Sequence, residues 1–121
     1  MRSRRPVVAA AIGCVLLCVA AAAGGCGPKT YYDWGSYEQS VQHLYSPQAE
    51  ATVIQDRQNL IEEVHKTETG GKKVPPGKYA QIGYLCYLTG DKRAAASYFD
   101  SEKKAYPEST KLMNDMIARL R

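Results

Sequence analysis

Apolar residues recur along the chain at helical spacing, and no six-residue segment alternates polar and apolar positions as a strand would. The first amphipathic stretch opens at Ser36. There, Ser36-Tyr-Glu-Gln39 has the form of a capping box, in which serine and glutamine side chains bond amides across the first turn. The apolar stripe that follows consists of Tyr37, Val41, Leu44 and Tyr45. The pattern predicts an all-α fold, a small helical bundle.

Two longer helices are predicted in the middle of the chain. Ser46-Pro47 predicts a helix start, because serine favours the N-cap and proline the first turn. Gly70-Gly71 should end this helix. Its inner face consists of Val53, Ile54, Leu60, Ile61 and Val64. A basic loop then leads to Val74-Pro-Pro-Gly77, and the third helix is expected from about Pro76 to Leu88.

The last third of the chain predicts a tight antiparallel helix pair and a final helix. Gly90 suits a helix stop and Asp91 suits the next N-cap. Small residues at Gly83 and Ala95 should let the paired helices approach closely, with Phe99 filling the neighbouring space. Pro107 should end the fourth helix. The final helix then has one apolar face, made of Leu112, Met113, Met116, Ile117 and Leu120.

The spacing of large and small residues in this pair resembles a tetratricopeptide repeat. The residues that carry the resemblance are Tyr79, Ile82, Gly83, Gly90, Ala95, Phe99 and Pro107. Cys86 and Lys92 stand where such repeats usually have tyrosine, and Glu102 stands where they usually have alanine. Gly35, Tyr37, Ser40 and Leu44 repeat only the second half of the pattern. Because about three repeats are normally needed to bury their faces, the flanking helices or a partner must cover this unit.

The N-terminus has the organisation of an export signal: basic residues, an apolar stretch from Val7 to Ala23, and then Gly24-Gly25-Cys26. The small residues before the cysteine resemble the lipobox of bacterial lipoproteins, where cleavage before a cysteine accompanies its modification by diacylglycerol. This resemblance implies lipidation of Cys26. It divides the chain into a signal peptide at 1–25, a lipidated tether at 26–35 and a helical domain at 36–121.

Two other interpretations of this segment remain open. Ala21-Ala22-Ala23 could be cleaved by an ordinary signal peptidase, which would release a soluble domain. The apolar run could also stay as a membrane anchor, although spanning usually needs about 20 residues. In the lipoprotein interpretation, Gly27 after the cysteine favours the periplasmic face of the outer membrane, because aspartate there would suggest retention in the inner membrane.

Charge and candidate chemistry exclude several classes of function. The chain has 16 Lys plus Arg against 12 Asp plus Glu, but Arg2, Arg4 and Arg5 belong to the export signal. The remaining balance predicts no nucleic-acid surface. Neither His43 nor His65 has metal-ligand spacing, Glu62-Glu63 is interpreted as a solvated helix edge, and Cys86 is expected to be buried as a small hydrophobic residue. We therefore expect no enzyme, no metal and no cofactor.

Tyrosine is unusually frequent, with nine tyrosines and one tryptophan in the chain. Such side chains combine apolar area with a polar tip, which suits a membrane interface or a protein partner. The residues predicted to bind a partner are Tyr31, Tyr32, Trp34, Tyr37, Tyr84 and Tyr87. The alternative is that Trp34 and Tyr37 only seal the end of the helical stack.

Three separated motifs resemble a family of small bacterial lipoproteins of unknown function. They are Tyr32-Asp-Trp-Gly-Ser-Tyr-Glu38, Val74-Pro-Pro-Gly-Lys-Tyr-Ala80 with Ile82-Gly-Tyr-Leu85, and Tyr98-Phe-Asp-Ser-Glu-Lys-Lys104 with Tyr106-Pro-Glu-Ser109. Members of that family are commonly encoded beside a CsgG-like lipoprotein, similar to the curli-secretion pore, and a second small lipoprotein. The resemblance implies an accessory or assembly role in an outer-membrane complex with other envelope lipoproteins. A periplasmic module that binds peptides or cell-wall fragments in a tyrosine-bearing groove is the alternative.

Overall fold

Helices form wherever the apolar spacing predicts them, and the computed structural model describes residues 31–47 and 50–121. The predicted signal peptide and Cys26 lie outside the described residues. So do residues 48–49, just after the predicted helix start at Ser46-Pro47. The helices of the described part, with no strand among them, are α2 (Tyr37–Leu44), α3 (Glu50–Thr69), α4 (Lys78–Leu88), α5 (Lys92–Ala105), the 3-10 helix η1 (Pro107–Ser109) and α6 (Thr110–Ala118).

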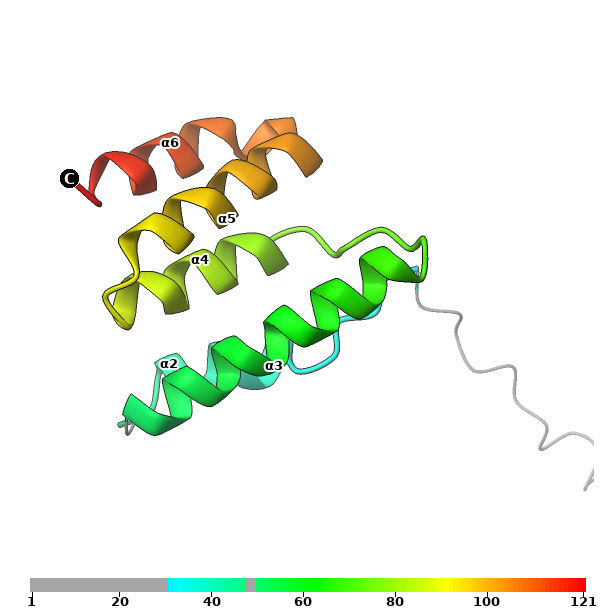
Figure 1. Ribbon diagram of the computed structural model, residues 1–121, viewed down its shortest axis with the longest axis horizontal. Helices are drawn as coiled ribbons and strands as arrows, with labels where there is room; N and C mark the ends of the chain where they lie inside the picture. Colours follow the sequence, from blue (N-terminus) through cyan, green and yellow to red (C-terminus); the bar gives the residue numbers. More distant parts are fainter. Residues whose placement is uncertain (1–30, 48–49) are drawn as a thin grey trace, which may run out of the picture. The chain divides into compact units, whose positions relative to one another are not determined.

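The helices are arranged in successive layers. Figure 1 shows α3, α4, α5 and α6 one after another, and each packs against the next, while α2 packs against both α3 and α4. All of them contribute side chains to one hydrophobic core or pack partly buried side chains against it. The buried apolar residues of that core are Leu60, Val64, Val74, Ile82, Leu85, Cys86, Ala95, Phe99, Met113 and Leu120. The predicted all-α fold and the predicted burial of Cys86 are confirmed.

The α4–α5 pair has the close approach that its small residues predict. A Cβ added at Gly83 would lie 2.7 Å from Cε1 of Phe99 and 3.2 Å from the carbonyl oxygen of Ala95. The turn between the helices also matches the prediction. Gly90 has a φ of +80°, and the Asp91 carboxylate accepts a hydrogen bond from the amide of Ala94 at 3.0 Å. Glycine at 83 is therefore required by packing, since any side chain would displace the Phe99 ring.

The predicted capping box at the start of α2 is wrong. The Ser36 side chain makes no capping hydrogen bond, and Gln39 is exposed. The Ser36 amide instead donates to the Glu63 carboxylate of α3, at 2.9 Å to Oε1. The Glu63 carboxylate therefore accepts the Ser36 amide, which is the role that the capping box predicts for the Gln39 side chain.

Three residues assigned to inner helix faces are exposed: Tyr45 at 88%, Ile54 at 43% and Leu112 at 61%. Tyr45 is the C-cap of α2, and the other two lie near the first turns of α3 and α6. A helical period identifies the apolar face, but it does not say how far the neighbouring helix covers that face. At these three positions the neighbouring helix does not cover the apolar face.

Tyr31, the first described residue, belongs to the same compact unit as the helices, so this unit includes residues before position 36. Residues 31–35 are assigned above to the tether, but the carbonyl groups of Asp33 and Trp34 accept from Lys78 of α4, and Gly35 lies against Glu63 of α3. Among the described residues, no helix combines the length and apolar character needed to cross a membrane.

Candidate functional site

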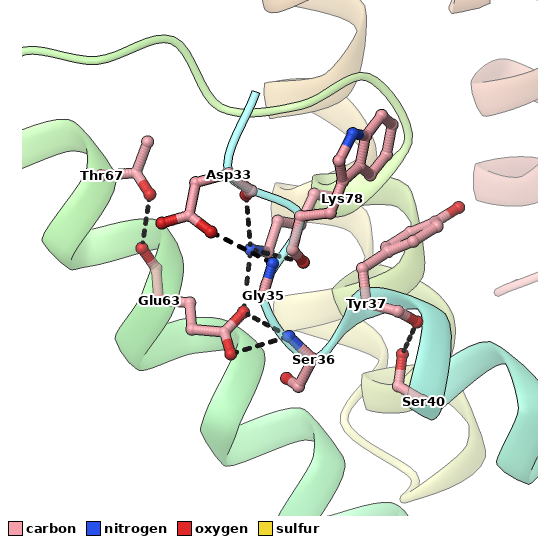
Figure 2. A network of polar contacts seen from close by, with 9 residues as sticks. Asp33, Gly35, Ser36, Tyr37, Ser40, Glu63, Thr67 and Lys78 are labelled. Atoms are coloured by element: carbon pink, nitrogen blue, oxygen red, sulfur yellow. Dashed lines mark hydrogen bonds and ion pairs between the residues drawn. The ribbon is translucent and has the colours of Figure 1, made fainter. Parts of the chain in front are cut away.

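A buried lysine holds the N-terminal segment on the helices. Lys78 is the first residue of α4, and only 1% of its surface is exposed. Its ammonium group lies 2.8 Å from Oε2 of Glu63, and it donates to the carbonyl oxygens of Trp34 at 3.2 Å and Asp33 at 3.4 Å. Figure 2 shows these groups converging on Lys78. One side chain therefore joins α4, α3 and the segment that precedes α2.

Glu63 completes this network from the α3 side. Both of its carboxylate oxygens accept the Ser36 amide, and a Cβ on Gly35 would overlap the carboxylate. Partial burial alone would raise the pKa of Glu63, but the hydrogen bonds from Lys78 and Ser36 outweigh burial and lower it. Glu63 is thus held ionised, and Gly35 is the residue that lets the chain pass over it.

The sequence pattern does not predict the ion pair of Lys78 with Glu63. Glu63 was interpreted as part of a solvated edge with Glu62, which is wrong for Glu63, while Glu62 is exposed as expected. One signal was available. A lysine in the first turn of a helix is disfavoured by the helix dipole, so Lys78 at that position indicates a nearby carboxylate that compensates.

The predicted aromatic residues near the N-terminus lie together as an aromatic row, which we define as Tyr31, Tyr32, Trp34 and Tyr37. Ring centroids are 4.8 Å apart from Tyr31 to Tyr32, 6.0 Å from Tyr32 to Trp34 and 5.4 Å from Trp34 to Tyr37. Tyr31 is 83% exposed and Trp34 is 40% exposed. The row therefore presents aromatic area to the surface, while the backbone of Trp34 is fixed by Lys78.

The other two predicted residues lie elsewhere. Tyr84 and Tyr87 lie in the second half of α4, about 9 Å and 14 Å along the helix axis from Lys78. Their rings lie 6.3 Å apart at an interplanar angle of 32°. They line a groove of about 180 Å³, which we call the α4–α6 groove, with Met116, Arg119 and Leu120. The single predicted set is in fact two separate surfaces.

A larger groove, lined by charged and polar residues, lies beside the aromatic row, at the C-terminal end of α3. Its volume is about 540 Å³. We call it the α3-end groove; it is lined by Asp33, Gly35, Glu63, Lys66, Thr67, Thr69, Gly70 and Lys72. Charges of both signs and two threonine hydroxyls therefore face the same space.

The matching protein family covers most of the described part of the chain. The family described as "Domain of unknown function (DUF4810)" matches residues 31–116. The chain belongs to the DUF4810 family. No curated protein and no solved structure matches the chain. The match begins at the aromatic row and includes Lys78 and Glu63, whereas Arg119 and Leu120 of the α4–α6 groove lie after its last residue.

Glu102 gives the DUF4810 domain a second capping carboxylate. It is 2% exposed and accepts the amides of Gly77 at 2.7 Å and Ala80 at 3.3 Å, at the start of α4. This contact gives the buried carboxylate of Glu102 a structural role. The α4 helix has no capping side chain of its own at Gly77, and α5 supplies one.

Of the remaining candidates for chemistry in the DUF4810 domain, Cys86 is buried and the His43 side chain bonds a carboxylate, whereas His65 is exposed. Burial raises the pKa of the Cys86 thiol, and Asp91 adds to this effect while Arg57 opposes it. His43 bonds the buried Asp56 at 2.7 Å, and His65 is exposed. Among residues 31–47 and 50–121, no group of three His, Cys, Asp or Glu side chains is placed to hold a metal ion. The raised pKa of the Cys86 thiol keeps it in its protonated form within the core.

Proposed function

We propose that this DUF4810 protein is a lipid-anchored, non-enzymatic protein-interaction module on the periplasmic face of the bacterial outer membrane. It would act as an assembly factor or accessory subunit of a cell-envelope complex. The observation that carries the proposal is the α4–α6 groove, in which two tyrosines, a methionine, a leucine and an arginine converge at the surface.

The chemistry of this groove suits a protein partner. Tyrosine, methionine and arginine are enriched in protein interfaces, where they supply apolar contact together with hydrogen-bonding tips. Small-molecule sites usually enclose about 300–1,000 Å³. The α4–α6 groove is smaller, at about 180 Å³, and so fits a few side chains of a docked helix or extended segment.

The arrangement of helices supports the same proposal. Both α4 and α6 pack on α5, and the groove is lined by α4, by the last turns of α6 and by the residues that follow it. We interpret the α4–α5 pair, with Gly83 and Ala95 against Phe99, as a tetratricopeptide-like unit. Repeats of that kind bind partners on extended concave surfaces. The partner proposed from the family resemblance is an envelope lipoprotein, foremost the CsgG-like pore.

The test is co-purification of the full chain from envelopes that contain the CsgG-like lipoprotein. We expect Tyr87→Ala to weaken recovery of that partner by tenfold or more, because buried interface tyrosines commonly contribute about 2 kcal/mol. Tyr45→Ala is the matched control, since Tyr45 is 88% exposed and lies outside the groove. Equal recovery with both variants would reject the groove as the partner site.

Lipid anchoring is tested separately. Cys26→Ala should abolish incorporation of labelled palmitate and leave an uncleaved precursor at the inner membrane, because the modified thiol is required before cleavage. Cys18→Ala, within the apolar run, should be labelled and processed as the wild type is. Normal cleavage of Cys26→Ala, with no lipid found on the wild type, would favour the Ala21-Ala22-Ala23 site instead.

A second candidate function is binding of peptide or cell-wall fragments. The α3-end groove favours it, because about 540 Å³ lined by lysines, carboxylates and threonines suits a zwitterionic peptide. Titration with soluble peptidoglycan fragments distinguishes the two functions. Saturable binding that Lys66→Ala removes and Tyr87→Ala leaves intact would support this candidate over the first.

A further inference from the structure

The aromatic row has a basic neighbour. The loop after α3 carries Lys72 and Lys73, both exposed, and Asp33 and Lys72 line the same α3-end groove. In Figure 1 the start of the described chain lies at the same end of α3 as this loop. Aromatic and basic side chains therefore share one end of the domain.

Direct contacts hold the loop in place. The Lys73 ammonium lies 4.7 Å from the ring centroid of Tyr106, and the Tyr106 hydroxyl donates to the Val74 carbonyl at 2.6 Å. Burial raises the pKa of Tyr106, and the nearby Tyr32 raises it further. The aromatic row and the loop meet at the surface in the α3-end groove, which Asp33 and Lys72 both line.

The exposed lysines of this surface outnumber its exposed carboxylates by one. Lys66, Lys72 and Lys73 are exposed, against Asp33 and Glu68. Glu63 adds no net charge, because Lys78 neutralises it. Glu68 is engaged as the acceptor of a hydrogen bond from the Tyr79 hydroxyl. Positive side chains beside exposed tyrosine and tryptophan are the combination found where proteins meet anionic lipid headgroups.

The position of the aromatic row along the chain indicates which partner this surface meets. Tyr31 follows the proposed lipid attachment point, Cys26, by five residues, which can span at most about 18 Å. The surface that contains Tyr31 is therefore held close to the bilayer to which the acyl chains belong. This step rests on the lipid anchoring in the proposed function, but not on the α4–α6 groove.

We propose that the aromatic row and the Lys72-Lys73 loop dock on the anionic headgroups of the membrane that holds the anchor. Trp34 enters the interface, and Lys72 and Lys73 contact lipid phosphates. Docking there leaves the α4–α6 groove, near the other end of α4, directed away from the lipid contact and open to a partner.

Trp34 is the single tryptophan of the chain, so its fluorescence reports this surface directly. The full chain is expressed, purified in its membrane-processed form and reconstituted in vesicles of phosphatidylglycerol and brominated phosphatidylcholine. We expect lipid brominated near the headgroup to remove about half of the Trp34 fluorescence, and lipid brominated at the chain end to remove much less. Aqueous acrylamide should quench Trp34 severalfold less in vesicles than in detergent.

Charge-reversal substitutions test whether the lysines of the loop contact the lipid. A lysine near an anionic surface contributes about fivefold to binding, so Lys72→Glu combined with Lys73→Glu should abolish quenching by the shallow bromines. The matched control is Lys92→Glu with Lys111→Glu, two exposed lysines on α5 and α6. This control should be quenched like the wild type. Circular dichroism melts check that both double variants are folded.

The outcomes separate this proposal from the proposed function. If the chain floats with the vesicles but Trp34 stays open to acrylamide, membrane docking is wrong while anchoring stands. If Trp34 becomes shielded only when the CsgG-like lipoprotein is added, the aromatic row is a protein interface and membrane docking is again wrong. If the chain does not float at all, both anchoring and docking are overturned.

Discussion

Replacing Phe99 with alanine should lower the free energy of unfolding by about 3–5 kcal/mol, the largest effect expected of any single substitution here. Phe99 is 1% exposed, and its ring fills the space that Gly83 leaves between α4 and α5. Alanine would leave a cavity in the most extensively packed helix pair of the domain, where both backbones are already close. Small domains have total stabilities of about 5–15 kcal/mol, so the variant should be close to unfolding at room temperature.

Urea denaturation followed by circular dichroism measures this loss. Tyr45→Ala serves as the control, because it also removes an aromatic ring, but one that is 88% exposed. The control should change stability by less than about 0.5 kcal/mol. Similar midpoints for both variants would mean that the α4–α5 contact at Gly83 does not hold the domain together.

Lys78→Met should lower the free energy of unfolding by about 2–3 kcal/mol. Breaking a fully buried ion pair typically costs about 3–5 kcal/mol, and this value is reduced because the Glu63 side chain is 31% exposed. The substitution keeps the length of the side chain but leaves Glu63 and the carbonyl oxygens of Asp33 and Trp34 without their shared donor. The same denaturation experiment measures the effect.

The pH dependence identifies the ion pair as the cause. The pKa of Glu63 lies below its usual value of 4.5 in the folded state. Its contribution to stability is therefore complete above about pH 4.5 and declines as the pH falls through the lowered pKa. The difference between wild type and Lys78→Met should shrink over that acid range. A difference that stays constant down to the acid limit would point to lost packing alone. A double-mutant cycle with Glu63→Gln isolates the pairwise energy.

Local sequence signals predicted the α4–α5 region well because each acts over a few residues. Asp91 caps the helix that follows it, Gly90 ends the helix before it, and Gly83 meets Phe99. The failures involve partners distant in sequence. The Ser36 amide bonds Glu63, 27 residues away, and Gly77 bonds Glu102, 25 residues away. No periodicity encodes such a pair, so Gln39 was assigned a capping role that Glu63 performs.

The candidate site shows the same division between features that the local sequence predicts and features that depend on packing. Residue type alone identified the aromatic side chains, because tyrosine and tryptophan in excess of the core must lie near the surface. Which of them lie together depends on helix packing, and the predicted set therefore separated into the aromatic row and the α4–α6 groove. The polar support beneath the row, Lys78 with Glu63, could have been suspected only from a lysine at an unfavourable helix position.

The capping carboxylate of Glu102 has a consequence for how the domain folds. The amides of Gly77 and Ala80 at the start of α4 are satisfied only when α5 is docked, because Glu102 lies on α5. Glu63 couples the start of α2 to α3 in the same way. Helices that depend on one another for their ends gain little from forming alone. Amide hydrogen exchange should therefore detect opening of α4 and α5 as one cooperative unit rather than as two helices that fray independently.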